Sequence, residues 1–223
     1  MIEFKHVYLK YTKEYYALYD INLKIDKGET VAVYGLKDSG KSSLLRLITG
    51  LEELTKGELY VREIPVKKID YSSDLSLGYI PYKGNFINRK TVYDNMKYIL
   101  KVRKVNTAEH ETLINNVLID LNIEGLRDQK IYKLSLYEKY LVSIARLLLR
   151  KLDVVLIDNI FEELSEQENK KILALIKKYF AKTTLLVATS GEDIAKSLCK
   201  RAIKLDHGSV VGEEHYGKKK ASM

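Results

Sequence analysis

The chain has 223 residues, of which 46% are hydrophobic and 30% charged, with a formal net charge of +8. This composition is typical of a globular protein with a full core and excludes an intrinsically disordered chain. No apolar run approaches the roughly 20 residues of a membrane span, and the N-terminus lacks the apolar core of a secretory signal. The single cysteine, Cys199, excludes an internal disulfide and is expected in the core.

The positive charge would suit an anionic partner such as nucleic acid, a membrane surface or a nucleotide. The basic residues are spread along the chain, however, and cluster only at residues 218–220. A scattered surplus usually belongs to a solvated surface, so we expect no nucleic-acid partner.

The first third of the chain predicts strands separated by turns, with one helix that a glycine at Gly50 can close. A turn at residues 26–29 leads into the third strand. The strands expected here cover residues 2–8, 21–25, 30–34, 56–61 and 77–80.

Helical spacing dominates from residue 91 to residue 150, and we expect Thr107 to cap the second of these helices. Buried strands then follow at residues 154–158 and 184–188, with a helix over 166–180 between them. Strands that alternate with helices predict an α/β fold with a mostly parallel sheet flanked by helices.

A phosphate-binding loop directly follows the third strand. The spacing G-x-x-x-x-G-K-S runs from Gly35 to Ser42, between a β-branched run and a helical pattern. Glycines let the backbone N–H groups turn toward an anion, Lys41 adds a full charge, and the Ser42 hydroxyl can hold Mg²⁺. The candidate nucleotide-binding residues of the loop are Gly35, Lys37, Asp38, Ser39, Gly40, Lys41, Ser42 and Ser43.

Asp158 is the second candidate element of the phosphate site. It ends a buried apolar strand, and ligands of parallel sheets bind beyond the carboxyl ends of the strands. Its carboxylate could hold Mg²⁺ together with Ser42. A strand-ending aspartate alone is more often a turn residue or a helix cap, and the phosphate loop is what favours the metal role.

In this order the landmarks resemble the nucleotide-binding domain of ABC (ATP-binding cassette) transporters, nearly from end to end. The phosphate loop and the Asp158 strand carry this resemblance together with further sequence segments. These segments are residues 50–51 with 57–59, 133–135, 145–150 and 206–211. The resemblance implies one P-loop NTPase domain over residues 1–223, with an N-terminal antiparallel β region and a helical subdomain over about 84–150.

The resemblance also implies partners. The chain would be a cytoplasmic subunit, peripheral on the inner face of the cell membrane, that pairs with a second nucleotide-binding subunit as a hetero- or homodimer. ATP and Mg²⁺ would lie between the two subunits, and their closure would drive an integral-membrane transporter subunit. That subunit is expected to contact residues 82–103.

Several family positions carry unusual residues here. Tyr11 sits where an aromatic residue stacks on adenine, or it is simply one packing tyrosine among seventeen. By resemblance, Tyr82 replaces a glutamine, Asn159 the catalytic glutamate, Ser190 the switch histidine, Ser165 the aspartate of an intersubunit loop and Asp38 a glycine. The signature Leu-Ser-Gly-Gly-Gln reads Leu134, Ser135, Leu136, Tyr137 and Glu138.

These replacements predict binding of ATP with Mg²⁺ and degenerate hydrolysis. The amide of Asn159 cannot take a proton from water as a carboxylate can, and Ser190 is short and uncharged. Glu162 or Glu163 could substitute as a base, although three or four residues of chain displace the carboxylate by several ångströms. One alternative is an active, divergent ABC ATPase. Another is a soluble ATP-binding module acting on nucleic acid or ribosomes, which the scattered basic residues disfavour.

Overall fold

The computed structural model describes residues 1–71 and 75–216. The N-terminal strands are β1 (Ile2–Lys10), β2 (Tyr16–Ile25), β3 (Thr30–Tyr34), β4 (Lys56–Val61), β5 (Ile64–Pro65) and β6 (Leu77–Ile80). The later strands are β7 (Val154–Asp158), β8 (Thr184–Thr189), β9 (Arg201–Asp206) and β10 (Ser209–His215). The α-helices are α1 (Lys41–Thr49), α2 (Val92–Val102), α3 (His110–Asp120), α4 (Leu136–Leu148), α5 (Glu166–Phe180) and α6 (Glu192–Leu198).

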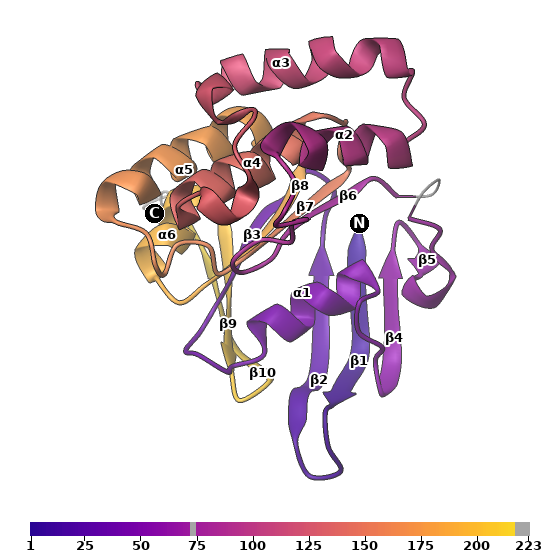
Figure 1. The fold of residues 1–223 in the computed structure, drawn as a ribbon. Coiled ribbons are helices and arrows are strands. Elements are labelled where there is room, and N and C mark those ends of the chain that lie inside the picture. Colours follow the sequence, from indigo (N-terminus) through magenta and orange to yellow (C-terminus); the bar gives the residue numbers. More distant parts are fainter. Residues whose placement is uncertain (72–74, 217–223) are drawn as a thin grey trace, which may run out of the picture.

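The strands form two sheets. The smaller sheet is antiparallel, in the order β2-β1-β4-β5. The larger sheet runs β10-β9-β3-β8-β7-β6, and every pair in it is parallel except β9 with β10. Helix α1 contacts strands of both sheets, so it lies between them (Figure 1).

Two hydrophobic cores share the larger sheet as a common wall. Because side chains alternate along a strand, neighbouring residues of β3 enter different cores. Val31 and Val33 pack with α1 and the antiparallel sheet, whereas Ala32 and Tyr34 pack with the helices on the opposite side. Strand β7 is fully buried, as expected for a strand covered on both faces.

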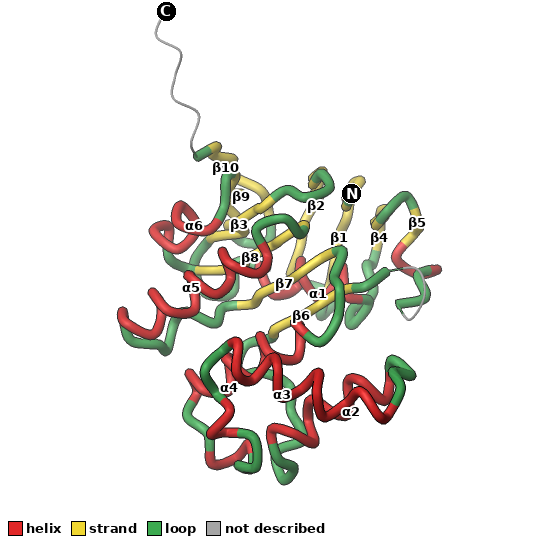
Figure 2. The backbone as a smooth tube through the Cα atoms, turned by 90° about the horizontal axis from the view of Figure 1, so that it is seen from above, coloured by secondary structure: helices red, strands yellow, loops and turns green. Residues whose placement is uncertain are grey.

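Helices α2, α3 and α4 gather beside the β6 edge of the sheet, whereas α5 and α6 cover one of its faces (Figure 2). Met96, Ile114, Leu118 and Ile144 are among the buried residues that join these helices to the core. None of the helices in the described ranges has both the length and the apolar character needed to cross a bilayer.

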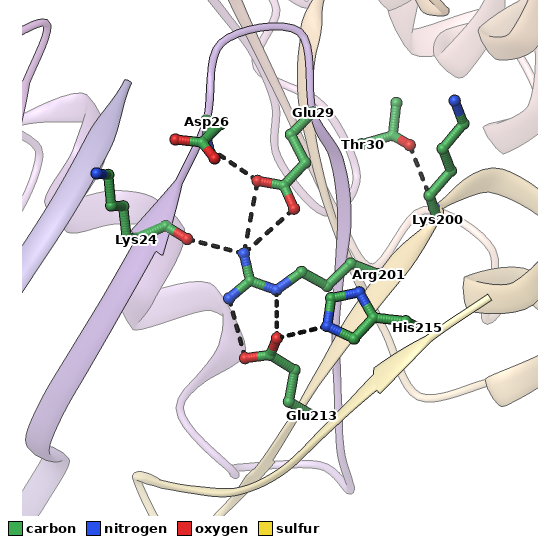
Figure 3. A network of polar contacts seen from close by, with 8 residues as sticks. All are labelled: Lys24, Asp26, Glu29, Thr30, Lys200, Arg201, Glu213 and His215. Atoms are coloured by element: carbon green, nitrogen blue, oxygen red, sulfur yellow. Dashed lines mark hydrogen bonds and ion pairs between the residues drawn. The ribbon is translucent and has the colours of Figure 1, made fainter. Parts of the chain in front are cut away.

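Arg201 at the start of β9 connects the two sheets. Its guanidinium donates to the backbone oxygen of Lys24 in β2 at 2.8 Å and to Glu29 before β3 at 3.2 Å. On its other side Nε and one terminal nitrogen reach the two carboxylate oxygens of Glu213 in β10 at 2.8 and 2.9 Å, and His215 also contacts Glu213 (Figure 3).

The predicted α/β class, with a mostly parallel sheet, an antiparallel N-terminal region and intervening helices, is confirmed. The expected cap at Thr107 is wrong. Asn106 precedes a 3-10 turn over Thr107–Glu109, and its Oδ1 accepts from the Ala108 N–H at 3.1 Å, because asparagine caps at least as well as threonine. The lysine cluster at residues 218–220 lies outside the described residues.

Candidate nucleotide-binding site

Strand register assembles the site at one edge of the large sheet. Asp158 at the end of β7 lies opposite Ala188 of β8, and Ala188 lies opposite Val33 of β3. The segments that leave these three strands therefore start at the same level, and they carry Gly35, Asn159 and Ser190.

The phosphate loop keeps its shape because its glycines fit where a larger residue does not. A Cβ atom on Gly35 would lie 2.2 Å from the backbone oxygen of Leu205, and one on Gly40 would lie 2.5 Å from that of Ala17. Gly40 also has φ of +99°, which favours glycine, and it precedes the first residue of α1. The exposed Asp38 adopts φ of +63°.

Lys41 is a buried cation at the start of α1. Only 3% of the residue is exposed, and Nζ donates to the backbone oxygens of Gly35 and Leu36 at 2.7 and 2.6 Å. Burial lowers the pKa of Lys41, whereas the carboxylates of Glu162, Asp158 and Asp38, in decreasing order, act to raise it. Nζ also contacts Ser39 Oγ at 3.5 Å, and a charge held by these neutral groups can turn toward a phosphate group.

Ser42 and Asp158 form the pair that fits a magnesium ion. The Ser42 hydroxyl donates to Asp158 Oδ1 at 2.7 Å, and the Tyr79 hydroxyl donates to Asp158 Oδ2 at 2.9 Å. The amide of Asn159 donates to Asp158 Oδ1 at 3.2 Å, while its Oδ1 is buried and accepts no hydrogen bond from the described residues. Hydroxyl, carboxylate and amide oxygens are the ligands that Mg²⁺ takes.

An open cleft of about 470 Å³ contains most of the predicted residues. It holds the cation, the magnesium pair and three tyrosines, with room for a polyphosphate beside Lys41. The lining residues are Tyr11, Tyr15, Ala17, Lys37, Asp38, Ser39, Gly40, Lys41, Ser42, Ser43, Arg46, Tyr82, Asp158, Asn159 and Glu162.

Tyr11 lies at the mouth of this cleft with half of its surface exposed. Its hydroxyl lies 2.8 Å from Ser43 Oγ and 2.8 Å from the carboxylate of Glu52, which also pairs with Arg46. Tyr15 stacks on it, with ring centroids 6.4 Å apart and planes at 22°. The exposed ring is thus positioned by contacts through its hydroxyl.

Glu162 enters the cleft and Glu163 does not. Ser190, which is outside the lining, donates its hydroxyl to Glu162 Oε1 at 2.6 Å, so the segments that follow β7 and β8 meet at Glu162. Glu163 instead pairs with Lys83 at 3.5 Å.

The predicted signature residues and Ser165 lie outside the lining of this cleft. Ser135 caps α4: its hydroxyl oxygen accepts from the Glu138 N–H at 3.2 Å, while the Glu138 carboxylate accepts from the Ser135 N–H at 2.8 Å. Ser165 caps α5 in the same way with Glu168. The remaining signature residues differ in exposure: Leu134 is buried, and Leu136 and Tyr137 are half-buried against the helical core.

Sequence reasoning missed Tyr79, Tyr15 and Arg46. Tyr79 lies on β6 opposite Leu156, and only the register of β6 against β7 brings its hydroxyl to Asp158. The tyrosine-rich segment around Tyr11 and the basic residue on the helix after the loop were the available signals for the other two.

The model of the family described as ABC transporter matches residues 18–162. The chain belongs to the ABC transporter family. A methionine import ATP-binding protein, MetN, of Clostridioides difficile is 32% identical over 217 residues, covering 95% of this chain and 67% of the relative. MetN 1 of Bacillus thuringiensis subsp. konkukian is 29% identical over 222 residues, covering 96% of this chain.

This member of the ABC transporter family spans 66% of that Bacillus protein and 54% of an sn-glycerol-3-phosphate import ATP-binding protein, UgpC, of Psychromonas ingrahamii, to which it is 30% identical over 90% of its length. Among solved structures, the dimeric bacterial ABC transporter cassette MJ0796 has a TM-score of 0.88 at 28% identity. That likeness covers 97% of this chain and 99% of the cassette.

Proposed function

We propose that this chain is the ATP-binding subunit of an ABC transporter, degenerate for hydrolysis, and the structural or regulatory half of the transport motor. It works in the cytoplasm, peripheral on the inner face of the cell membrane. Residues 1–223 act as a single nucleotide-binding domain whose helical subdomain covers about 84–150. The observation that carries the proposal is one cleft holding Lys41 and the Ser42–Asp158 pair, with an amide at Asn159.

The loop binds the phosphates of ATP, since its backbone and Lys41 present donors and charge to one cavity. Ser42 and Asp158 hold Mg²⁺, which neutralises phosphate charge when it is bound. Tyr11 and Tyr15 give the mouth of the cleft an aromatic surface for the base. Hydrolysis is weak because Asn159 supplies no carboxylate next to the magnesium pair.

A second nucleotide-binding subunit, identical or different, closes over the cleft. At the start of α4, the Glu138 carboxylate accepts from the N–H and the hydroxyl of Ser135, which places a negative charge at the helix N-terminus that could face a partner's phosphate. Leu136 and Tyr137 add bulk at the same turn. A partner's nucleotide thus receives a poor contact from this chain, and a homodimer is nearly inert.

The integral-membrane subunit docks at residues 82–103. In support, a cavity of about 330 Å³ opens there between α2, α4 and β6, and Arg103, Arg146 and Arg150 line it. Tyr98 and Val102 are exposed beside it, which gives the surface an apolar rim. Relatives of two kinds, a methionine importer subunit and an sn-glycerol-3-phosphate importer subunit, match this chain in sequence, so we propose that the membrane subunit determines the cargo.

Calorimetry of Mg²⁺–ATP binding, with phosphate release followed on the same sample, tests the proposal. We expect binding that Lys41→Ala abolishes, together with turnover far below that of a complete ABC subunit. Lys27→Ala is the matched control, because Lys27 is an exposed lysine of the turn before β3. If Lys41→Ala bound Mg²⁺–ATP as tightly as the wild type does, the assignment of the cleft as the nucleotide site would be refuted.

One observation favours the second candidate, an active and divergent ABC ATPase. Glu162 places a carboxylate in the cleft although Asn159 has none. Turnover comparable to that of a complete ABC subunit would select this candidate.

A further inference from the structure

Glu162 is an acidic residue of the cleft that neither the phosphate loop nor the magnesium pair uses. It lies four residues beyond Asp158, in the segment between β7 and α5. Its carboxylate is the first of the three that act on Lys41, ahead of Asp158 and Asp38. A carboxylate close to the lysine that binds phosphate is also close to the reacting end of a nucleotide.

Ser190 holds this carboxylate in place. It follows β8 and donates its hydroxyl to Glu162 Oε1 at 2.6 Å, a short charge-assisted hydrogen bond. Within the described part of the chain, Glu162 Oε2 makes no hydrogen bond and is free to accept one. The two positions thus form a carboxylate–hydroxyl pair across the ends of two neighbouring parallel strands.

Asn159 is oriented differently. It adopts φ of +50°, and its amide nitrogen points to Asp158 and Ser42. Its side chain is therefore committed to the magnesium pair, and the space beside Lys41 is bordered by Glu162.

We propose that Glu162, positioned by Ser190, is the carboxylate that orients and deprotonates the attacking water in a slow hydrolysis of ATP. This inference rests on the proposed function, because it requires ATP to bind with its terminal phosphate at Lys41. It replaces the absent carboxylate at Asn159 with one that reaches the cleft from further along the chain.

The step balances as follows. The water oxygen bonds to the γ-phosphorus while the bond from that phosphorus to the β–γ bridging oxygen breaks, so ADP leaves with the bonding electron pair. The water proton passes to Glu162 Oε2 and then to solvent or the released phosphate. Ser190 keeps its proton and donates throughout to Oε1, which leaves Oε2 directed at the water.

Glu162→Gln tests the proposal, with Glu163→Gln as the matched control because Glu163 pairs with Lys83 instead. We expect Glu162→Gln to lower kcat for phosphate release by about 100-fold or more, the range of a lost general base. Calorimetry should show that Glu162→Gln binds Mg²⁺–ATP about threefold more tightly than the wild type does, because the variant has one negative charge fewer near the phosphates. Glu163→Gln should leave both quantities unchanged.

Ser190 is tested as a positioning residue. Ser190→Ala should lower kcat without weakening Mg²⁺–ATP binding, and Ser190→Thr, which keeps a hydroxyl, should restore most of the rate. A folding defect would lower binding as well, so the split between kcat and Kd distinguishes the two roles.

The outcomes separate this inference from the proposed function. Absence of Lys41-dependent binding would overturn the proposed function itself. Binding without measurable turnover in the wild type, or turnover that Glu162→Gln leaves intact, would overturn the role of Glu162 and leave the ATP-binding subunit standing. A rise in kcat in Glu162→Gln would also overturn it, because the carboxylate would then obstruct the nucleotide.

Discussion

Asp158 illustrates how single residues set the chemistry of the cleft. Only 1% of the residue is exposed, yet hydroxyls of Ser42 and Tyr79 and the amide of Asn159 all donate to it. Desolvation, followed by the charge of Asp158, raises the pKa of the Tyr79 phenol, so this donor stays protonated at neutral pH. A buried carboxylate with donors on both oxygens is fixed in direction, as a metal ligand must be.

Asp158→Asn should therefore remove the dependence of ATP binding on Mg²⁺. We expect the ratio of the Kd values measured with EDTA and with Mg²⁺ to fall toward one, because an amide is a far weaker ligand for a hard cation. Tyr79→Phe is the control, since it removes a donor and keeps the carboxylate. Equal Mg²⁺ dependence in wild type and Asp158→Asn would contradict the metal assignment.

Cys199 makes a prediction about pH. It is buried just after α6, and burial raises the pKa of its thiol from 9.0 to about 12. The stabilisation from the neutral buried thiol is complete below pH 9 and is lost as the pH rises toward 12. A colorimetric thiol reagent at pH 8 should label Cys199 only at the rate of unfolding, and rapid labelling of the native protein would contradict this burial.

At the scale of elements, the phosphate loop, its strand and the strand that ends in Asp158 were predictable, because each has a local pattern of glycines or apolar residues. The positions of Glu162 in the cleft and of the Tyr79 hydroxyl at Asp158 were not predictable. Both depend on strand register and on the conformation of a connecting segment, which periodicity does not encode. The Thr107 cap failed for a local reason, since Asn106 one residue earlier caps the turn.

The two helices that begin with Ser-x-x-Glu should respond alike to loss of their caps. Ser135→Ala in α4 and Ser165→Ala in α5 each remove a hydroxyl that bonds the first turn, at a cost of about 1 kcal/mol in unfolding free energy. Urea titration measures both. Ser197→Ala is the control, because Ser197 lies near the end of α6 and is not an N-cap residue. If this variant lost as much unfolding free energy as the two cap variants, the effect could not be assigned to capping.

At the scale of the whole molecule, the two cores lie on opposite faces of the large sheet, and Arg201 connects that sheet to the antiparallel one (Figure 3). Arg201 is 14% exposed at its side chain and faces two carboxylates, Glu29 and Glu213. Hydrogen bonding to Arg201 lowers the pKa of Glu213 from its usual 4.5. The Arg201–Glu213 pair therefore stabilises the fold above about pH 4.5, and this stabilisation is lost as the pH falls through the lowered pKa of Glu213.

Arg201→Met should cost about 1–3 kcal/mol of unfolding free energy at pH 7, because two partly buried carboxylates lose their partner. The difference from wild type should shrink as the pH falls below 4.5, and guanidinium titrations at several pH values measure it. Lys170→Met, which removes an exposed pair with Glu166, should cost under about 0.5 kcal/mol at any pH. A pH-independent loss in Arg201→Met would show that packing, and not charge, accounts for the effect.

The stacked tyrosines at the mouth of the cleft have an optical consequence. The chain has no tryptophan, so Tyr11→Trp would place the sole indole chromophore where we propose that a nucleotide base binds. Its emission, excited beyond the absorption of tyrosine, would report each arrival and departure of a nucleotide in real time. Because the chain has no tryptophan of its own, the rest of the protein would add no indole emission to the signal of this single reporter.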